Sequence, residues 1–281
     1  MKISEIEFKE LILKTNDELA DECKSISSRP INATINILKK YNISGPIVGN
    51  SESGISFPVT NINLCDHVDN WYQSSYGDSL KVDFTQGTFP VEIDGTVFKC
   101  KAPLIFGQAL IIASKGTFDK KILNVVDCIH ELPSFARERL SSDTEGFLTP
   151  MMKICLDVKR ILRSIDSEML SSAISDIGVS CDLLIGQQTN SSLSAWHSLQ
   201  FTEKVIKHYI SKHEEPKWTH EIKKLRNKAK LLGYEPDERI NWDLFKFDPT
   251  VRYNPNQISK SDALAINHEA WRIAWDILHQ L

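Results

Sequence analysis

An arginine and a histidine stand seven positions apart near the end of the chain, in the stretch VRYNPNQISKSDALAINHEAWRIAWDILHQ over residues 251–280. They are Arg272 and His279. Seven residues make about two turns of a helix, so both side chains share one face, with their Cα atoms roughly 10 Å apart. A phosphodiester can bridge that separation, and histidine suits proton transfer because its pKa lies near neutrality. The spacing therefore indicates a candidate catalytic pair.

The same helix also has a simpler interpretation. Asp276 lies four residues after Arg272, where it can pair with the guanidinium and repel an incoming phosphate. His279 is close to the end of the chain, where helices fray. Together with His268, these residues form one polar strip of the helix. We favour a solvated polar face over catalysis, because a single short match in a polar helix is easily met by chance.

Basic side chains gather on another predicted helix, over residues 220–232, with Thr219 as its N-cap and Gly233 as its C-cap. Its apolar stripe consists of Ile222, Leu225, Ala229 and Leu232. A charge run opposite an apolar stripe is usually a solvated face, and we favour that interpretation. The alternative is a ridge that binds phosphate groups, with Trp218 as the nearby aromatic residue suited to stacking on a base. The candidate binding residues of this ridge are Lys204, Lys207, His220, Lys223 and Arg226.

The pair Arg252–Tyr253 is a further candidate for ligand binding, just before a helix that Ser259 is expected to cap. The tyrosine could instead pack its ring on a helical bundle and point its hydroxyl outward. The arginine could then pair with Glu203 or Glu269. The sequence leaves both alternatives open.

The predicted helices and strands divide the chain into helical regions and one β region. Residues 4–42 have helical spacing, and from residue 119 onward the pattern is again helical. Between residues 80 and 113, alternating apolar residues and the Asp94-Gly95 pair predict a small antiparallel β element with a hairpin. The run 104–113 is either a buried strand or an apolar helix. The aromatic residues expected to stack on this sheet are Trp71, Tyr72 and Tyr76.

These patterns predict an α+β protein that is mostly helical, with one part over residues 1–150 and a helical domain over 151–281. The formal net charge of −4 excludes a global pull toward nucleic acid. From residue 187 onward, however, 14 basic and 12 acidic residues give +2, against −6 for the rest of the chain. The C-terminal third is therefore the part better suited to meet a polyanion.

The cysteines and histidines do not predict a metal site. The six cysteines are dispersed without a Cys-x-x-Cys pair. His208, His213 and His220 are expected to be exposed, and the stretch CDHVDNW at 65–71 is expected to begin a helix. The start MKISEIEFKE is unlike a signal peptide, and the apolar run 102–114 is too short to cross a membrane. We expect reduced thiols in a cytoplasmic protein, without metal, cofactor or membrane contact.

Two segments together resemble the HEPN (higher eukaryotes and prokaryotes nucleotide-binding) domain family. The resemblance covers about residues 165–281, and nothing before residue 160 matches a family. The matching residues of the first segment are Gln200, Glu203, Lys204, Lys207, Thr219, His220, Ile222 and Leu225. The matching residues of the second are Arg252, Tyr253 and Pro255, with one inserted residue, followed by Ala263, Ala265, Ala270 and Ala274.

The resemblance implies a four- or five-helix bundle, often dimeric, in proteins of bacterial or phage conflict such as defence and toxin–antitoxin systems. Many relatives are metal-independent ribonucleases with an Arg-x4–6-His motif, in which the arginine holds the phosphate and the histidine moves the proton of the 2′-hydroxyl. Since Arg272 and His279 fit that motif only formally, we expect a nucleotide- or RNA-binding or assembly module, forming a homodimer or binding a cognate partner protein. The alternatives are a ribonuclease toxin that uses the pair, and a protein–protein adaptor acting through the N-terminal β element.

Overall fold

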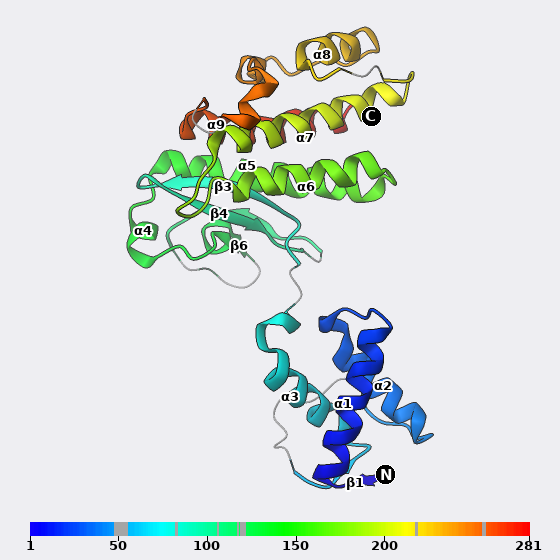
Figure 1. Ribbon diagram of the computed structural model, residues 1–281. Coiled ribbons are helices and arrows are strands. Elements are labelled where there is room, and N and C mark those ends of the chain that lie inside the picture. The colour runs from blue at the N-terminus through cyan, green and yellow to red at the C-terminus, as the bar shows by residue number, and fades with distance from the viewer. Residues whose placement is uncertain are drawn as a thin grey trace. The chain divides into compact units, whose positions relative to one another are not determined.

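The chain forms two compact units, Met1–Asp83 and Phe84–Leu281 (Figure 1). The computed structural model describes residues 1–47, 56–81, 84–105, 107–116, 118, 122–216, 219–254 and 257–281. The division expected near residue 150 is wrong, because the predicted hairpin belongs to the helical unit. Its residues Phe89 and Val91 are buried in the same core as Met151 and Met152. The boundary therefore follows burial and not the change from β to helical pattern.

The first unit is a small helical assembly closed by a short β pair. Its elements are β1 (Lys2–Ile3), α1 (Glu5–Asp21), the 3-10 helix η1 (Ile26–Ser28), α2 (Arg29–Lys40), β2 (Val59–Thr60), α3 (Leu64–Tyr76) and η2 (Gly77–Leu80). Strand β1 pairs antiparallel with β2. Ser4 begins α1 with a capping box, since its hydroxyl accepts from the N–H of Glu7 while its own N–H donates to the Glu7 carboxylate.

The expected stacking of three aromatic residues on the hairpin is wrong. Trp71, Tyr72 and Tyr76 all lie in α3, within the first unit. Tyr72 is fully buried there, and its ring stacks on Tyr76 with 5.7 Å between the ring centroids. Tyr72 and Tyr76 are four residues apart and so share a helix face, and all three rings pack on their own unit. The stretch CDHVDNW does begin a helix, as predicted, with Asp66 in the first turn.

The β part of the second unit confirms the predicted hairpin. Strand β3 (Gly87–Ile93) pairs antiparallel with β4 (Thr96–Ala102), and the turn between them is Asp94-Gly95. Both turn residues have positive φ, 51° and 76°, as a two-residue hairpin requires. The ambiguous run 104–113 contains the short strand β5 (Leu110–Ile112), which pairs in parallel with β6 (Ile122–Asn124). Strand β6 lies in the region predicted to be wholly helical.

Helices make up the rest of the second unit. They are the 3-10 helix η3 (Val125–Cys128), α4 (Ser134–Glu138), α5 (Ser142–Ser164), α6 (Glu168–Asp182), α7 (Ser191–Ser211), α8 (Ile222–Leu231), η4 (Trp242–Phe245), η5 (Pro249–Tyr253) and α9 (Lys260–Leu278). Helix α7 packs against α6, α8 and α9, while α9 also packs against α5 and β3. In Figure 1, α8 lies on the side of α7 away from the hairpin. The protein is thus α+β and mostly helical, as the sequence predicts.

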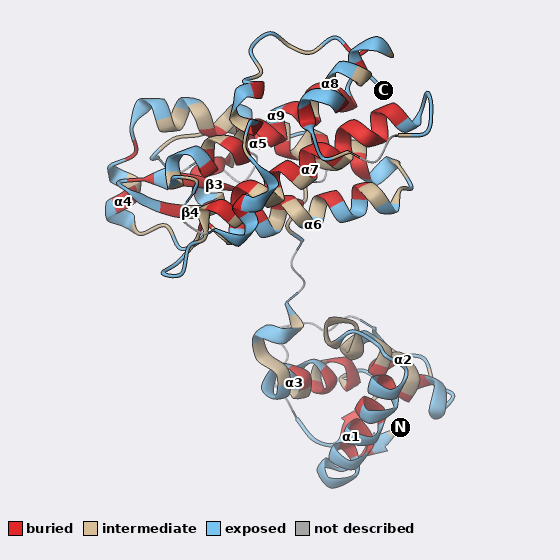
Figure 2. Ribbon diagram, turned by 45° about the horizontal axis from the view of Figure 1, so that its top comes forward, coloured by how far each residue is buried: buried red, intermediate tan, exposed pale blue. Residues whose placement is uncertain are grey.

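Helix α9 is buried along most of its surface, which corrects the expected solvated strip (Figure 2). Ser259 caps its start, as predicted, by accepting from the N–H of Asp262. Asp276 is buried, and His268 is partly buried with its Nε2 2.6 Å from the carbonyl oxygen of Pro90 in β3. His268 and Asp276 are therefore held by partners inside the unit, whereas Arg272 and His279 are exposed as the strip predicts.

Small polar residues hold α6, α7 and α9 close together. Ser180 of α6 forms hydrogen bonds with Ser194 and Ser198 of α7, at 3.0 and 2.7 Å, and accepts from the side-chain amide of Asn267 in α9. All four residues are fully buried. The network satisfies polar groups that would otherwise destabilise a packed core.

Helices of the described residues are all too short or too polar to cross a membrane. All six cysteines are free thiols.

Candidate functional site

Helix α8 and the segment after it form the first candidate site. The helix begins at Ile222, two residues later than predicted, and its N-cap is Glu221 and not Thr219. The Thr219 hydroxyl instead accepts from the N–H of Glu221 in the turn before the helix. Gly233 ends it, as predicted, with φ of +101°. The N–H of Tyr234 then donates to the carbonyl of Ala229, a Schellman end that turns the chain back along the bundle.

A cavity of about 360 Å³ lies between α8, α7 and the segment 242–249. We call it the α8 groove. Its lining residues are Leu199, His220, Glu221, Ile222, Lys223, Arg226, Trp242, Asp243, Phe245, Lys246, Phe247 and Pro249. The floor is aromatic and aliphatic, and the rim carries three cations and two carboxylates. Cavities of this size with an apolar floor and a few polar groups are typical of small-ligand sites.

Arg226 is the most distinctive residue of the α8 groove. Its guanidinium lies over the indole ring of Trp242, 4.8 Å from the centroid. Its Nε is buried and has no hydrogen-bond partner among the described residues. Lys246 is paired with Asp243 at 2.7 Å, whereas Lys223 is exposed and carries no ion pair within the described part of the chain. Arg226 and Lys223 therefore offer positive charge that the protein does not itself neutralise.

Two of the predicted binding lysines do not face this groove. Lys204 donates to Asp176 of α6 at 2.5 Å, and the buried Lys207 donates to Glu203 at 2.7 Å. Glu203 also accepts from Nδ1 of His220, at 3.0 Å. The alternative of a phosphate-binding ridge receives no support from these two lysines, since each is already neutralised by a carboxylate. His220, Lys223 and Arg226 are brought together as predicted.

Arg252 and Tyr253 form a stacked group beside the α8 groove. The guanidinium of Arg252 lies 5.1 Å from the ring centroid of Trp196 and 4.5 Å from that of Tyr253. Tyr253 is 70% exposed, and Glu203 and Glu269 are paired with other residues, so the alternative of a packed tyrosine and a paired Arg252 is not observed. Trp196 precedes Leu199 of the groove by one turn of α7, and η5 carries both Pro249 and this pair. Trp218 and Pro255 lie outside the described residues.

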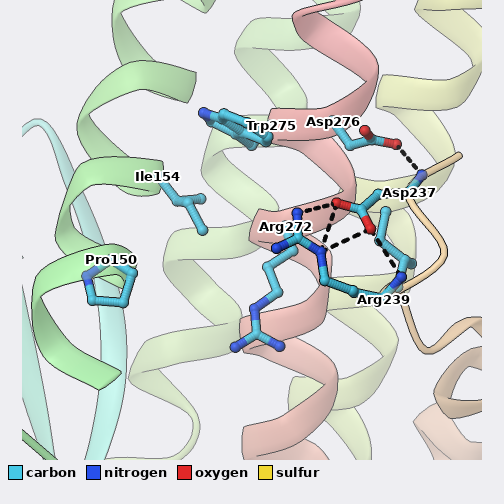
Figure 3. Close-up of a pocket in the computed structure, with 8 residues that line it drawn as sticks. Pro150, Ile154, Asp237, Arg239, Arg272, Trp275 and Asp276 are labelled. Atoms are coloured by element: carbon cyan, nitrogen blue, oxygen red, sulfur yellow. Dashed lines mark hydrogen bonds and ion pairs between the residues drawn. The ribbon is translucent and has the colours of Figure 1, made fainter. Parts of the chain in front are cut away.

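A second cavity, of about 350 Å³, contains Arg272 (Figure 3). We call it the α9 pocket. Pro150, Ile154, Asp237, Arg239, Ile240, Arg272, Trp275 and Asp276 line it. Arg239 is held by the Asp237 carboxylate through three hydrogen bonds of 2.5 to 3.1 Å. Arg272 donates to the buried Glu269 at 3.1 Å. Each guanidinium of this pocket thus already has its own carboxylate.

Asp276 adds a further negative charge to the α9 pocket. The pairing of Asp276 with Arg272 that the sequence suggested does not form. Asp276 instead accepts from the hydroxyl of Tyr234 at 2.6 Å and from the N–H of Asp237 at 3.2 Å. Burial, and then the Asp276 carboxylate, raise the pKa of Tyr234. With Glu269 included, three carboxylates face two guanidiniums. An additional phosphate is therefore electrostatically disfavoured here.

His279 does not line the α9 pocket. It is the C-cap of α9, where its Nδ1 donates to the carbonyl of Trp275 at 2.8 Å and its ring lies 4.4 Å from the indole. The predicted catalytic pair therefore shares a helix without sharing a cavity. The sequence analysis did not predict the residues of the segment 237–249 as part of a site. Their aromatic and basic residues, in the stretch NWDLFKF, could have indicated it.

One expected exposed histidine is buried. His208 lies inside α7, its Nε2 has no partner among the described residues, and burial lowers its pKa. Within the part of the chain that the structure describes, no three histidine, cysteine or acidic side chains are grouped to hold a metal ion.

Comparisons of the chain with protein-family models, curated proteins and solved structures found no match.

Proposed function

We propose that the second unit binds a nucleotide or single-stranded RNA in the α8 groove. The observation that carries this is the stacking of Arg226 on Trp242 at the wall of an apolar cavity, with its Nε unpartnered. An aromatic floor can receive a base, while a guanidinium and an ammonium on the rim can bind phosphate. The Arg252 and Tyr253 stack extends this surface and gives a strand a second place for a base.

The charges of the two cavities support this choice. By lining residues alone, the α8 groove has three cations against two carboxylates, whereas the α9 pocket has two against two, and both of its guanidiniums are already paired. A polyanion is therefore favoured at the first cavity over the second. For this reason we propose a binding module without ribonuclease activity from Arg272 and His279.

The HEPN assignment is part of the same proposal. Helices α5, α6, α7 and α9 with the shorter α8 are compatible with the four or five helices that the resemblance implies. A role in defence or toxin–antitoxin systems, and a homodimer or a cognate partner protein, follow from the resemblance alone. A cytoplasmic location is proposed from the six free thiols and the charged start of the chain. The adaptor alternative receives less support, since the hairpin β3–β4 buries Phe89, Val91 and Cys100 in its own unit.

Isothermal titration calorimetry with mononucleotides and short single-stranded RNA tests the binding site. Arg226→Ala and Lys223→Ala should each weaken binding by about tenfold or more, as loss of one charge-assisted hydrogen bond would. Lys230→Ala is the matched control, because Lys230 is exposed on the same helix and does not line the groove. Binding that all three variants leave unchanged, or no binding at all at low salt, contradicts the proposal.

A separate incubation of the purified protein with RNA tests the catalytic alternative. We expect no cleavage above the buffer control. RNA degradation that Arg272→Ala or His279→Ala abolishes would establish the ribonuclease and refute our exclusion of it.

A further inference from the structure

A third cavity, of about 880 Å³, lies between the second half of α5 and the chain that enters β5. We call it the α5 groove. It shares no lining residue with the α8 groove. Its described lining residues are Gln86, Leu104, Ile105, Gly107, Gln108, Ala109, Ile111, Leu156, Asp157, Lys159, Arg160, Arg163 and Ser164.

The helix side of the α5 groove is the most positive of the three cavities, with three cations and one carboxylate. Asp157 is already paired with Arg160, at 3.2 Å. Lys159 and Arg163 are one turn apart and have no hydrogen bond or ion pair within the described residues. Lys159 is partly buried, and burial, followed by the charge of Arg163, lowers its pKa. Two adjacent cations without a counter-charge repel each other, and an anion bound between them relieves that repulsion.

The opposite side of the α5 groove is aliphatic. Leu104, Ile105, Ala109 and Ile111 contribute to it, and Leu156 continues it onto the helix. Leu104, Ile105 and Ile111 are only partly buried, so they leave apolar surface that a ligand could cover. No tyrosine, tryptophan or phenylalanine is among the described lining residues, whereas Trp242, Phe245 and Phe247 line the α8 groove.

We propose that the α5 groove binds an amphiphilic anion, an aliphatic chain that ends in a carboxylate or a phosphate. The head group lies between Lys159 and Arg163, since the guanidinium fork and the ammonium both match these oxyanions. The chain lies along Leu104, Ile105 and Ile111. A free amphiphile and the head group of a membrane lipid share this chemistry, so the test includes one arm for each source.

Calorimetric titration of the full chain with decyl phosphate, below its aggregation threshold, tests the site. We expect saturable one-to-one binding at least tenfold tighter than that of inorganic phosphate or decanol. Shortening the chain should weaken binding by up to about fourfold per methylene group, the value for full burial. Lys159→Gln and Arg163→Gln should each weaken binding about tenfold, whereas Lys153→Gln, an exposed site on the same helix, should not.

The second arm uses vesicles of phosphatidylcholine with and without phosphatidic acid. Cosedimentation that needs both phosphatidic acid and Lys159 identifies a lipid head group as the source, whereas binding of monomeric decyl phosphate alone identifies a free amphiphile. Equal affinity for decanol and decyl phosphate overturns the proposal, as does binding that both glutamine variants leave unchanged. Two results together also overturn it: binding of a short RNA that Lys159→Gln weakens, and binding of decyl phosphate that is no tighter than that of inorganic phosphate.

Discussion

Lowering the pH should destabilise the second unit through His268. Its Nε2 donates to the carbonyl of Pro90, and its ring lies 4.6 Å from that of Phe147. Burial, and then the nearby charge of Arg272, lower the pKa of His268 from 6.5 to about 4, against the opposing effect of the Pro90 carbonyl. The folded protein therefore keeps this imidazole neutral at a pH where the unfolded chain protonates it.

The sign and size follow from that difference in pKa. Between pH 6.5 and 4 the unfolded chain binds more protons than the folded one, so stability is complete above pH 6.5 and is lost as the pH falls toward 4. Between about pH 7.5 and about pH 4.5, this single group should remove about 2.5 kcal/mol from the free energy of unfolding.

Urea unfolding of the wild type and of His268→Gln at both pH values measures the effect. Glutamine can donate to the same carbonyl and does not titrate, so all other titrating groups cancel in the difference between the two proteins. Tryptophan fluorescence reports on the correct unit, because five of the six tryptophans follow residue 84. If both proteins lose the same free energy to within about 1 kcal/mol, His268 is not held neutral and our description of α9 as a packed helix is wrong.

Three further substitutions test individual contacts. Tyr234→Phe removes the hydroxyl that donates to the buried Asp276 and should cost about 1.5–3 kcal/mol in urea unfolding; a change below about 0.5 kcal/mol would show that water replaces it. Gly233→Ala should cost about 1–2 kcal/mol because of its φ of +101°, whereas Gly146→Ala, on an exposed helix face, should stabilise by up to about 1 kcal/mol. Equal effects of the two glycine substitutions would contradict this assignment. Ser4→Ala should cost about 0.5–2 kcal/mol of the first unit's stability, measured by circular dichroism. No loss of stability would show that the cap is open in solution.

Local signals in the sequence predicted the elements well where the structure depends on neighbouring residues. Ser259 begins α9 and Gly233 ends α8 as cap chemistry requires, and Asp94-Gly95 forms the predicted turn. Contacts between distant residues were not predictable in this way. The parallel pair β5–β6 joins segments whose alternation is too short to detect, and the hairpin's membership of the second unit depends on burial beneath α5 and α9.

The residues of the candidate site were likewise predicted only in part. His220, Lys223 and Arg226 were predicted as binding residues, and one cavity brings them together. Trp242 and Phe247 were missed, because they lie in a segment without helical or strand periodicity. The ion pairs of Lys204 and Lys207 were not predictable, since the carboxylates that neutralise them come from α6 and from a buried position on α7 itself.

The arginines at 226 and 272 show why spacing alone does not identify a phosphate site. Spacing fixes which side chains share a helix face, whereas binding depends on what each guanidinium already contacts. A phosphate at Arg272 would have to displace Glu269, whose buried carboxylate would keep only the N–H of Asn241 as a hydrogen-bond donor. A phosphate at Arg226 displaces no carboxylate, because this guanidinium has no ion pair within the described residues. The same residue type therefore favours an anion in the α8 groove and opposes it in the α9 pocket.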